Sequence, residues 1–319
     1  MRQVVITQFG DPDVLQLVEA PTPEPSEGEV MISVQSAGVN PIDYKTRAGQ
    51  GFVAGAICDS LPWVPGFDVA GTIETLGPGV HNWRIGDPVV GMVGFPRTGG
   101  GYAEKAVVSG KDLCRAPDSL PLEEAGGVPL AALTAWQGLF IHLALQPDQK
   151  VLILGGAGGV GHFAIQFAAQ HGAHVVATGS GANEDFLHKI GAHEVINYEA
   201  EDVHDVCYGL DAVLDLVGGE VGKAALSTLS DHGKLVTVPT VTAEMIRQAG
   251  EQRGFQVSGY VVEPDTDQLE EILALLGRDE VRLHVSAAYP LADAPAAQRR
   301  QEEGHVRGKL ILQPCPGQT

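Results

Sequence analysis

The sequence predicts an α/β protein in which a doubly wound parallel sheet is joined to a mostly-β, barrel-like domain. From about residue 120 onward, segments of strand length alternate with segments of helix length, which is typical of a parallel sheet with helices on both faces. The first 117 or so residues instead hold many short apolar runs separated by Gly and Pro, which is typical of a compact barrel or sandwich.

The expected strands of the first region are short and several alternate between apolar and polar side chains. Residues 29–36 show the clearest alternation, as a half-buried strand should, and the Pro/Glu run at 21–28 is a loop. The strands are expected at 4–6, 14–18, 29–36, 69–74, 87–93 and 103–108.

The second region and the tail supply the alternating elements. Residues 128–145 form the most apolar long run, but Pro129, Gln137 and His142 interrupt it, so we expect a buried interdomain helix rather than a membrane span. Strands are expected at 151–154, 174–178, 195–197, 211–217, 235–238, 255–262, 283–287 and 309–312, and helices at 162–171, 184–190, 220–230, 269–276 and 296–303.

The domain organisation expected from these elements is discontinuous. Residues 1–120 and 264–319 would form the catalytic, substrate-binding domain, because the tail is inferred to return to it. Residues 121–263 would form the dinucleotide-binding domain.

A glycine-rich turn follows the four aliphatic residues 151–154 and opens a helix. Its Gly-x-Gly-x-x-Gly spacing is Gly156, Gly158 and Gly161, and a strand-turn-helix context makes that spacing a dinucleotide fingerprint rather than a flexible loop. We assign the tight turn to Gly156, the close approach of a pyrophosphate to Gly158, and the packing of helix on strand to Gly161. Exposed amides at the helix N-terminus favour phosphate there. The predicted cofactor-binding residues of the turn are Gly156, Ala157, Gly158, Gly159, Val160 and Gly161.

The end of the second strand bears on which dinucleotide binds. NAD-specific sites place Asp or Glu about 20 residues beyond the glycines, where it accepts from the ribose 2′-hydroxyl. Here residues 178–183 hold no carboxylate before Glu184, which favours NADPH, although no Arg or Lys lies in the loop either. Thr178, Ser180 and Asn183 are offered as cofactor contacts, and a helix-capping role fits Asn183 equally well.

Composition excludes several other classes. The chain of 319 residues carries 40 acidic against 20 basic residues, a formal charge of −20, which argues against nucleic acid or an anionic membrane as partner. Cys58, Cys114, Cys207 and Cys315 form no C-x-x-C pair, so neither a disulfide framework nor a cysteine-rich metal site is expected. No secretory signal is expected, and together these features favour a cytoplasmic protein.

The sequence also shows no set of zinc ligands. Catalytic zinc needs about three Cys, His or carboxylate ligands, and a structural lobe needs about four close thiolates. His162, His171 and His174 are interpreted as surface or helix-end residues. A metal-free site is therefore expected.

With these residues assembled, the chain resembles the medium-chain dehydrogenase/reductase superfamily, specifically its zinc-independent, zeta-crystallin-like NADPH:quinone oxidoreductases. The resemblance covers nearly all of residues 1–313 and implies a Rossmann sheet and a GroES-like catalytic domain. It rests on six motifs in the family's order, at 37–45, 65–71, 129–136, 155–161, 211–215 and 304–309.

Three departures from zinc-dependent relatives agree with a metal-free site. Phe67 stands where those relatives carry a His-Glu pair, and no cysteine stands near Asn40. The stretch 91–102 is too short for their structural zinc lobe.

The resemblance also implies roles for individual residues in a cleft between the domains. Asn40 would orient the substrate or the cofactor ribose, and Tyr44 would hydrogen-bond the substrate oxygen or supply a proton; a Tyr merely packed on the core is the alternative. Thr134 would touch the nicotinamide amide. Lys309 would support the cleft, the alternative being a solvated residue that opens a strand.

The function expected from the resemblance is hydride transfer from NADPH to a quinone. The alternatives are an alkenal or enone double-bond reductase and, in another class, a non-catalytic NADPH-binding protein. A homodimer that pairs through residues 255–262 at the sheet edge is also expected.

Overall fold

The computed structural model describes residues 1–314, and these residues divide into two compact units. The first unit contains Met1–Ala131, Pro264–Asp279 and the chain from Val285 onward; the second contains Ala132–Glu263 and Glu280–His284. Cys315 and the last residues of the expected 264–319 segment lie outside the described residues.

The first unit is built on a mostly antiparallel sheet. Its strand order is β14-β15-β3-β4-β5-β7, with β6 also paired to β3 and β1-β2 as a separate hairpin. The alternation at 29–36 becomes the long central strand β3. The strands are β1 (Arg2–Ile6), β2 (Leu15–Glu19), β3 (Glu29–Val39), β4 (Asp68–Leu76), β5 (Pro88–Met92), β6 (Lys105–Ser109), β7 (Leu113–Arg115), β14 (Val285–Pro290) and β15 (Lys309–Gln313).

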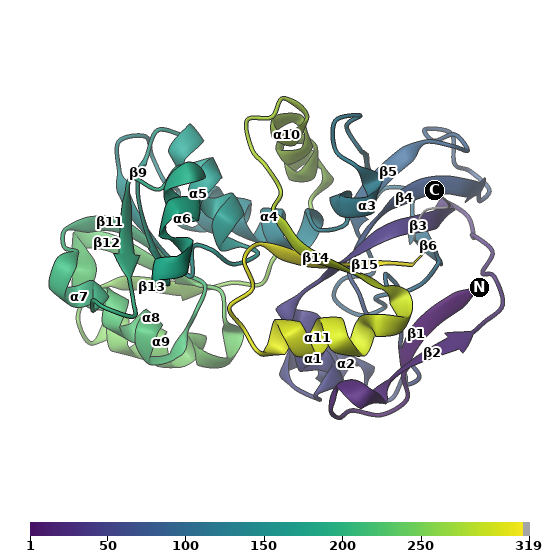
Figure 1. Ribbon diagram of the computed structural model, residues 1–319, viewed down its shortest axis with the longest axis horizontal. Coiled ribbons are helices and arrows are strands. Elements are labelled where there is room, and N and C mark those ends of the chain that lie inside the picture. The colour runs from purple at the N-terminus through teal and green to yellow at the C-terminus, as the bar shows by residue number, and fades with distance from the viewer. Residues whose placement is uncertain (315–319) are drawn as a thin grey trace. The chain divides into compact units, whose positions relative to one another are not determined.

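The tail of the chain completes this sheet. β15 pairs antiparallel with β3, Leu310 facing Val39, and β14 pairs parallel with β15. Figure 1 shows α11 alongside α1, near β14 and β15. Residues at the two ends of the sequence therefore meet on neighbouring strands.

The helices of the first unit include α1 and α2, which were not predicted, because residues 1–117 were expected to be mostly strands. Both start signals of α1 are in the sequence: Pro41 at the first helical position and Asp43 at the third, where an acidic side chain can bond the N-cap amide. The helices are α1 (Pro41–Arg47), α2 (Gly51–Ile57), α3 (Leu122–Ala125), α10 (Thr266–Gly277) and α11 (Ala294–Glu302), with short 3-10 turns η1 (Pro12–Val14) and η5 (Leu291–Asp293).

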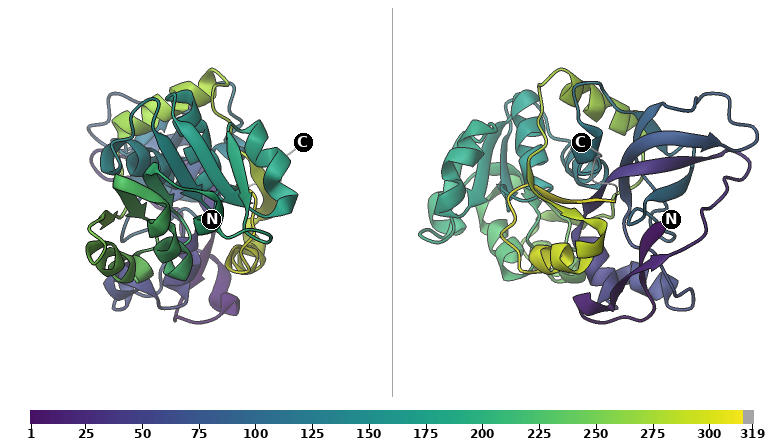
Figure 2. Two further views of the ribbon diagram at one scale, coloured as in Figure 1. Left: turned by 90° about the vertical axis from the view of Figure 1, so that its left-hand side faces the viewer. Right: turned by 45° about the vertical axis from the view of Figure 1, so that its right-hand side comes forward.

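The second unit holds the predicted doubly wound sheet. All five pairings in its strand order, β10-β9-β8-β11-β12-β13, are parallel, which confirms the predicted fold class. Figure 2 shows these strands side by side with helices flanking them. The strands are β8 (Lys150–Leu154), β9 (His174–Gly179), β10 (Glu194–Asn197), β11 (Leu210–Asp215), β12 (Leu229–Thr237) and β13 (Gln256–Gly259).

The helices of the second unit differ from expectation at several places, and the short helix at 203–206 is one that was not predicted. The predicted helix 220–230 ends earlier, the helix α9 was not predicted, and the apolar run 128–145 becomes α4 followed by a π-helix. The elements are α4 (Pro129–Trp136), the π-helix η2 (Gln137–His142), α5 (Gly161–Gln170), η3 (Gly181–Asn183), α6 (Glu184–Lys189), α7 (Val203–Val206), α8 (Gly219–Ala224), η4 (Ala225–Thr228) and α9 (Thr240–Glu251). Among residues 1–314, no helix combines the length and apolar composition of a membrane span.

The unit boundaries differ from the expected domain limits for a local reason. Residues 121–131 join the first unit because Ser36 Oγ donates to Leu122 O at 2.5 Å and Asp68 accepts from the Leu130 amide at 2.8 Å. Residues 280–284 join the second because the Arg282 amide donates to Gln166 Oε1 at 2.8 Å.

Candidate active site

Asn40 lies at the junction of β3 and α1, where its side chain is buried and makes hydrogen bonds through both its oxygen and its nitrogen. Its Oδ1 accepts from Lys309 Nζ at 2.5 Å, and its Nδ2 donates to Asp68 Oδ2 at 2.8 Å. Because the amide oxygen bonds to a cation and the amide nitrogen to an anion, the orientation of the amide is fixed. This predicted site residue therefore sits in a rigid chain of polar groups.

Lys309 and Asp68 form a buried ion pair around that amide. The two side chains are 3% and 0% exposed, with Nζ and Oδ2 4.0 Å apart, and Lys309 Nζ also donates to Val39 O at 3.2 Å. Burial lowers the pKa of Lys309 and raises that of Asp68, and the opposite charge of each partner counters these shifts. The alternative of a solvated lysine is therefore wrong. The geometry directs Lys309 to Asn40.

The close approach of β3 and β4 makes room for this pair. A Cβ on Gly38 would lie 2.6 Å from Asp68 Oδ2 and 2.5 Å from Gly126 O, a distance that real Cβ atoms do not show. Only glycine at position 38 lets the carboxylate reach Asn40.

Asp43 is a second buried carboxyl, on α1. Its Oδ2 accepts from the Asn40 amide at 2.8 Å and from the Tyr102 hydroxyl at 3.1 Å. Burial, with Asp68 nearby, raises the pKa of Asp43 to about 7, although the Asn40 and Tyr102 hydrogen bonds oppose the rise. The Tyr102 phenol, itself buried, has a pKa well above its usual value and stays protonated.

Tyr44 follows Asp43 on α1 and is half-buried. Within residues 1–314 its hydroxyl makes no hydrogen bond. Burial and the negative charge of Glu302 raise its pKa, so the phenol is neutral and able to donate across the neutral range. The geometry thus leaves this predicted site residue available as a hydrogen-bond donor.

The C-terminal half of α1 is tied to α11 and to the N-terminal segment by a buried arginine. Arg47, 1% exposed, donates from Nε to Gln298 Oε1 at 2.8 Å and from one terminal nitrogen to Gly10 O at 2.7 Å. The other terminal nitrogen pairs with Glu302 at 2.8 Å. These contacts set the position of the helix that carries Asn40 and Tyr44 at its start.

The glycine turn of the second unit has the geometry of a phosphate cradle. A Cβ on Gly161 would lie 2.3 Å from Gly155 O, so helix α5 can pack this closely only with glycine there. A Cβ on Gly158 would meet nothing nearer than Gly155 O at 3.4 Å, so the backbone is open to a ligand on that side. The turn therefore fits a dinucleotide pyrophosphate.

One assignment within the turn was wrong. The residue with the left-handed backbone of the tight turn is Gly155, at φ +72°, not Gly156. A Cβ on Gly156 would instead crowd Ala177 and Ile165, each at 3.0 Å. Gly156 is thus required for packing against β9 and α5.

The predicted contacts at the end of β9 bond to the turn or to one another. Thr178 Oγ1 accepts from the Gly155 amide at 3.0 Å, which shapes the glycine turn. Asn183 stands at the N-cap position of α6, and its Nδ2 donates to Ser180 Oγ at 3.0 Å. The structure also brings in a carboxylate that the spacing did not show: Glu199 Oε2 accepts from the Gly181 amide at 3.2 Å.

Thr134, the predicted nicotinamide contact, is buried near the end of α4 in the second unit. Its backbone carbonyl accepts from the Tyr260 hydroxyl. Thr134 belongs to the second unit, whereas Asn40, Tyr44 and Lys309 belong to the first.

The side chains at the position where zinc-dependent relatives bind zinc are unsuited to a metal. Phe67 is fully buried and packs against Phe95 and Trp63, with ring centroids 5.2 and 5.9 Å apart, and the Asn40 oxygen already holds an ammonium group. In the described part of the chain, the one set of three side chains that could converge on an ion is the exposed group Asp202, His204 and Asp205.

The three histidines predicted at the surface or at helix ends stand at the ends of elements, but His162 is not exposed. His171 stands at the C-cap of α5 and His174 opens β9. His162 is in the first turn of α5 but fully buried, with Nδ1 3.0 Å from Gly158 O and Nε2 3.3 Å from the His284 amide. The prediction of a helix-end residue therefore holds for His162, whereas the alternative of a surface residue was wrong, because residues 280–284 cover it.

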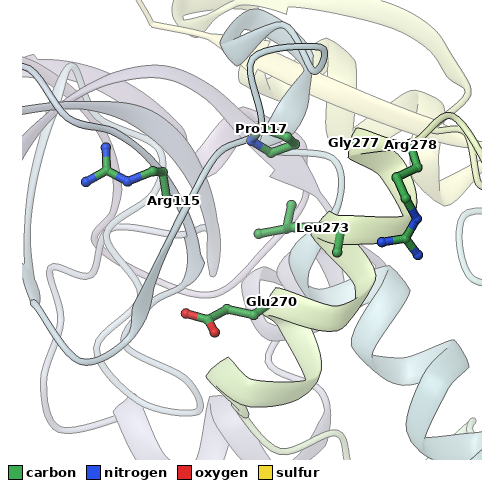
Figure 3. Close-up of a pocket in the computed structure, with 7 residues that line it drawn as sticks. Arg115, Pro117, Glu270, Leu273, Gly277 and Arg278 are labelled. Atoms are coloured by element: carbon green, nitrogen blue, oxygen red, sulfur yellow. The ribbon is translucent and has the colours of Figure 1, made fainter.

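Sequence reasoning missed Asp43, Asp68 and Tyr102 as site residues. Asp68 had a signal, since a carboxylate stands at the start of strand β4, directly before the apolar pair Val69 and Ala70. A separate surface pocket of about 430 Å³ in the first unit, shown in Figure 3, involves none of these residues; Arg115, Pro117, Glu270, Leu273, Ala274, Gly277 and Arg278 line it.

Known proteins match the chain over nearly all its length. The family described as "Alcohol dehydrogenase GroES-like domain" matches residues 26–118, and "Zinc-binding dehydrogenase" matches residues 190–312. The quinone oxidoreductase structure from Coxiella burnetii is 39% identical with a TM-score of 0.94, over 98% of this chain and 99% of that one.

Two curated plant relatives, both from Arabidopsis thaliana, extend the likeness. The chloroplast envelope quinone oxidoreductase homolog is 30% identical over 94% of each chain. The chloroplastic NADPH-dependent alkenal/one oxidoreductase is 31% identical over 99% of this chain and 80% of its own length.

The two-unit fold, the glycine turn and these matches define an enzyme class: the chain belongs to the medium-chain dehydrogenase/reductase superfamily. Its cofactor is a nicotinamide dinucleotide, which the glycine turn would hold. Within the superfamily, the matches and the metal-poor donor set place it in the zinc-independent quinone oxidoreductase group.

Proposed function

We propose that this protein transfers a hydride from NADPH to a quinone or a similar electrophilic carbonyl compound without zinc. The observation that carries the proposal is the ammonium group of Lys309 bonded to Asn40, together with Phe67, a side chain that cannot bind metal, next to Asp68 in the sequence. Without a Lewis acid to polarise an unactivated ketone, the site suits substrates that are already electrophilic. Quinone names among the relatives support this choice.

In the proposed reaction NADPH, when bound, supplies the hydride, and the chain supplies positioning and a proton. One hydride and one proton convert a quinone to its hydroquinone. The neutral Tyr44 phenol donates to the substrate oxygen as negative charge develops there, and solvent then returns the proton to Tyr44. Asn40, fixed between Lys309 and Asp68, presents an oriented amide with a cation behind it.

Tyr44→Phe tests this role. We expect kcat to fall by roughly 10²-fold, the usual contribution of a positioned general acid, with NADPH affinity unchanged. Tyr289→Phe, on β14 of the same unit and partly buried, is the matched control. An unchanged kcat for Tyr44→Phe would leave the phenol as a packing residue only.

Metal independence is tested by following NADPH consumption with 1,4-benzoquinone after exhaustive dialysis against EDTA. Activity should survive. Loss of activity with recovery on adding zinc would overturn the metal-free mechanism.

A second candidate function is reduction of the double bond of an alkenal or enone. The relative named NADPH-dependent alkenal/one oxidoreductase favours it, and the same residues would act, with Tyr44 donating to the carbonyl oxygen. Product analysis after parallel incubation with a quinone and an enone separates the two reactions. If neither substrate is turned over although NADPH binds, a non-catalytic cofactor-binding role is supported.

NADPH is proposed over NADH because residues 178–183 carry no carboxylate. Ser180 and Asn183 offer donors for a 2′-phosphate, whereas Glu199 at the Gly181 amide opposes it. Fluorescence titration with both cofactors measures the preference, and equal affinities would remove the argument.

A homodimer is proposed through β13. This strand is the edge of the six-stranded sheet and three of its four residues are exposed, and Val241 and Val261 nearby are 73% and 41% exposed. Exposed apolar edges favour pairing. Light scattering after size exclusion should give twice the chain mass of 33.5 kDa, and a monomer would contradict the proposal.

A further inference from the structure

The break between α4 and the π-helix η2 lies close to Thr134. The sequence predicts one helix over 128–145, yet α4 ends at Trp136 and Gln137–His142 adopts wider π-helical turns. In the π-helix the Leu143 amide bonds to Gly138 O, five residues back, at 3.0 Å. π-Bulges are frequent at functional sites, and a side chain that inserts into the hydrogen-bond ladder also distorts a helix.

The group that enters the ladder is the Tyr260 hydroxyl. It donates to the Thr134 carbonyl and accepts from the Gly138 amide. In an uninterrupted α-helix these two backbone groups, four residues apart, would bond to each other. The phenol oxygen thus lies between two backbone groups that an uninterrupted α-helix would join directly.

Gly138 makes the space for this insertion. A Cβ at position 138 would lie 2.8 Å from the Tyr260 oxygen and 2.8 Å from Leu214 Cδ1. Any other residue would push the phenol away from the ladder. The glycine and the tyrosine therefore work as a pair, although 122 positions separate them in the sequence.

Tyr260 is held firmly where it enters. It follows β13, whose Gly259 is paired with Thr237 of β12, and His142 stacks on its ring with centroids 4.2 Å apart. Next to it, the Gln137 side chain donates to Glu263 O at 2.8 Å and accepts from the Glu263 amide at 3.0 Å. The segment after β13 thus contacts the α4–η2 break through two residues, Tyr260 and Glu263.

We propose that Tyr260 is a positioning residue, which inserts into the α4 ladder and thereby fixes Thr134 in the place where it holds the nicotinamide end of the dinucleotide. The inference rests on the proposed function for the role of Thr134. Without the hydroxyl, the Thr134 carbonyl loses the donor that lies between it and the Gly138 amide, and the two backbone groups are able to bond to each other as in an α-helix. That change would rewind η2 and move Thr134 relative to the sheet.

Tyr260→Phe, which removes the hydroxyl alone, is the test, read with two ligands. NADPH carries the nicotinamide end and adenosine 2′,5′-bisphosphate lacks it. We expect NADPH affinity to fall roughly tenfold, with the bisphosphate affinity unchanged. Tyr208→Phe, at a 62% exposed tyrosine of the same unit, should change neither. Hydrogen exchange of the Gly138 amide in the ligand-free protein should also differ from wild type.

Gly138→Ala should weaken NADPH binding in the same selective way, and combining it with Tyr260→Phe should add little further loss because both variants remove one interaction. Equal affinity of Tyr260→Phe and wild type for NADPH would overturn the proposal. So would an equal loss for both ligands, which indicates general damage. If the wild type binds NADPH but reduces no quinone, the proposed reaction is refuted. The binding measurements still test the role of Tyr260, because they do not depend on turnover.

Discussion

Lys309→Met tests whether the buried ion pair holds the active-site asparagine in place. Methionine keeps the apolar stem of the lysine but removes the ammonium that lies 2.5 Å from Asn40 Oδ1 and 4.0 Å from Asp68 Oδ2. Asp68, 0% exposed, then keeps its hydrogen bonds but has lost its counter-charge. Removing one partner of a buried pair costs about 3–5 kcal/mol, so we expect the free energy of unfolding of the first unit to fall by that amount.

The double variant Lys309→Met with Asp68→Asn removes both charges. The Asn40 amide is then free to turn over, so that its oxygen accepts from the new amide at position 68 while the Leu130 amide keeps its acceptor. We expect the double variant to lose only about 1–2 kcal/mol, because replacing both charges of a buried pair is far less costly than replacing one. In Asp68→Asn alone the amide cannot turn, since Lys309 still needs its oxygen.

The assay is urea unfolding followed by tryptophan fluorescence in a Trp136→Phe background. The two remaining tryptophans, Trp63 and Trp83, both belong to the first unit, so the signal reports on that unit. Lys105→Met removes the partly exposed pair with Glu74 and should cost about 0–1 kcal/mol. The reasoning is refuted if Lys309→Met costs no more than this control, or if the two single costs simply add in the double variant.

The remaining predictions concern pH, cofactor choice and packing of the turn. The pKa of about 7 for buried Asp43 lies above that of an unfolded aspartate, so the folded chain binds the proton more tightly and Asp43 lowers stability as pH rises from about 4 to 7. The loss is of order 4 kcal/mol, and Asp43→Asn should flatten this part of a stability–pH curve; an unchanged slope would contradict it. Glu199→Gln removes a carboxylate at the Gly181 amide and should raise the NADPH-to-NADH affinity ratio by roughly two- to fivefold at low salt, fading at high salt; a ratio that is unchanged at low salt would place Glu199 away from the 2′-phosphate. Gly161→Ala sets a Cβ 2.3 Å from Gly155 O and should abolish titratable binding of both cofactors, whereas binding at wild-type affinity would show that the helix can retreat without loss.

Local sequence patterns were enough to predict those parts of the fold that depend on residues close together in the sequence. The aliphatic run at 151–154 became β8, and the glycine spacing after it became a turn open to a ligand at Gly158. The helix α9 was not predicted. It lies between the strands expected at 235–238 and 255–262, and it buries little apolar surface, since its buried residues are Ile246 and Gly250. The tight turn was assigned to Gly156, one position after the residue with the left-handed backbone, Gly155, because consecutive glycines cannot be told apart without the backbone.

The sequence by itself determined the parallel sheet and its glycine turn, because both follow from periodicity and spacing, whereas Asn40 and Tyr44 were proposed from the family resemblance. The tertiary structure alone decided what surrounds them. Lys309 bonds to Asn40 across 269 positions only because β15 pairs with β3, and Tyr260 reaches Thr134 across 126 positions only because β13 ends beside α4. Such contacts depend on how distant strands pair and on where glycine leaves room for a neighbour, and neither has a signature in local sequence.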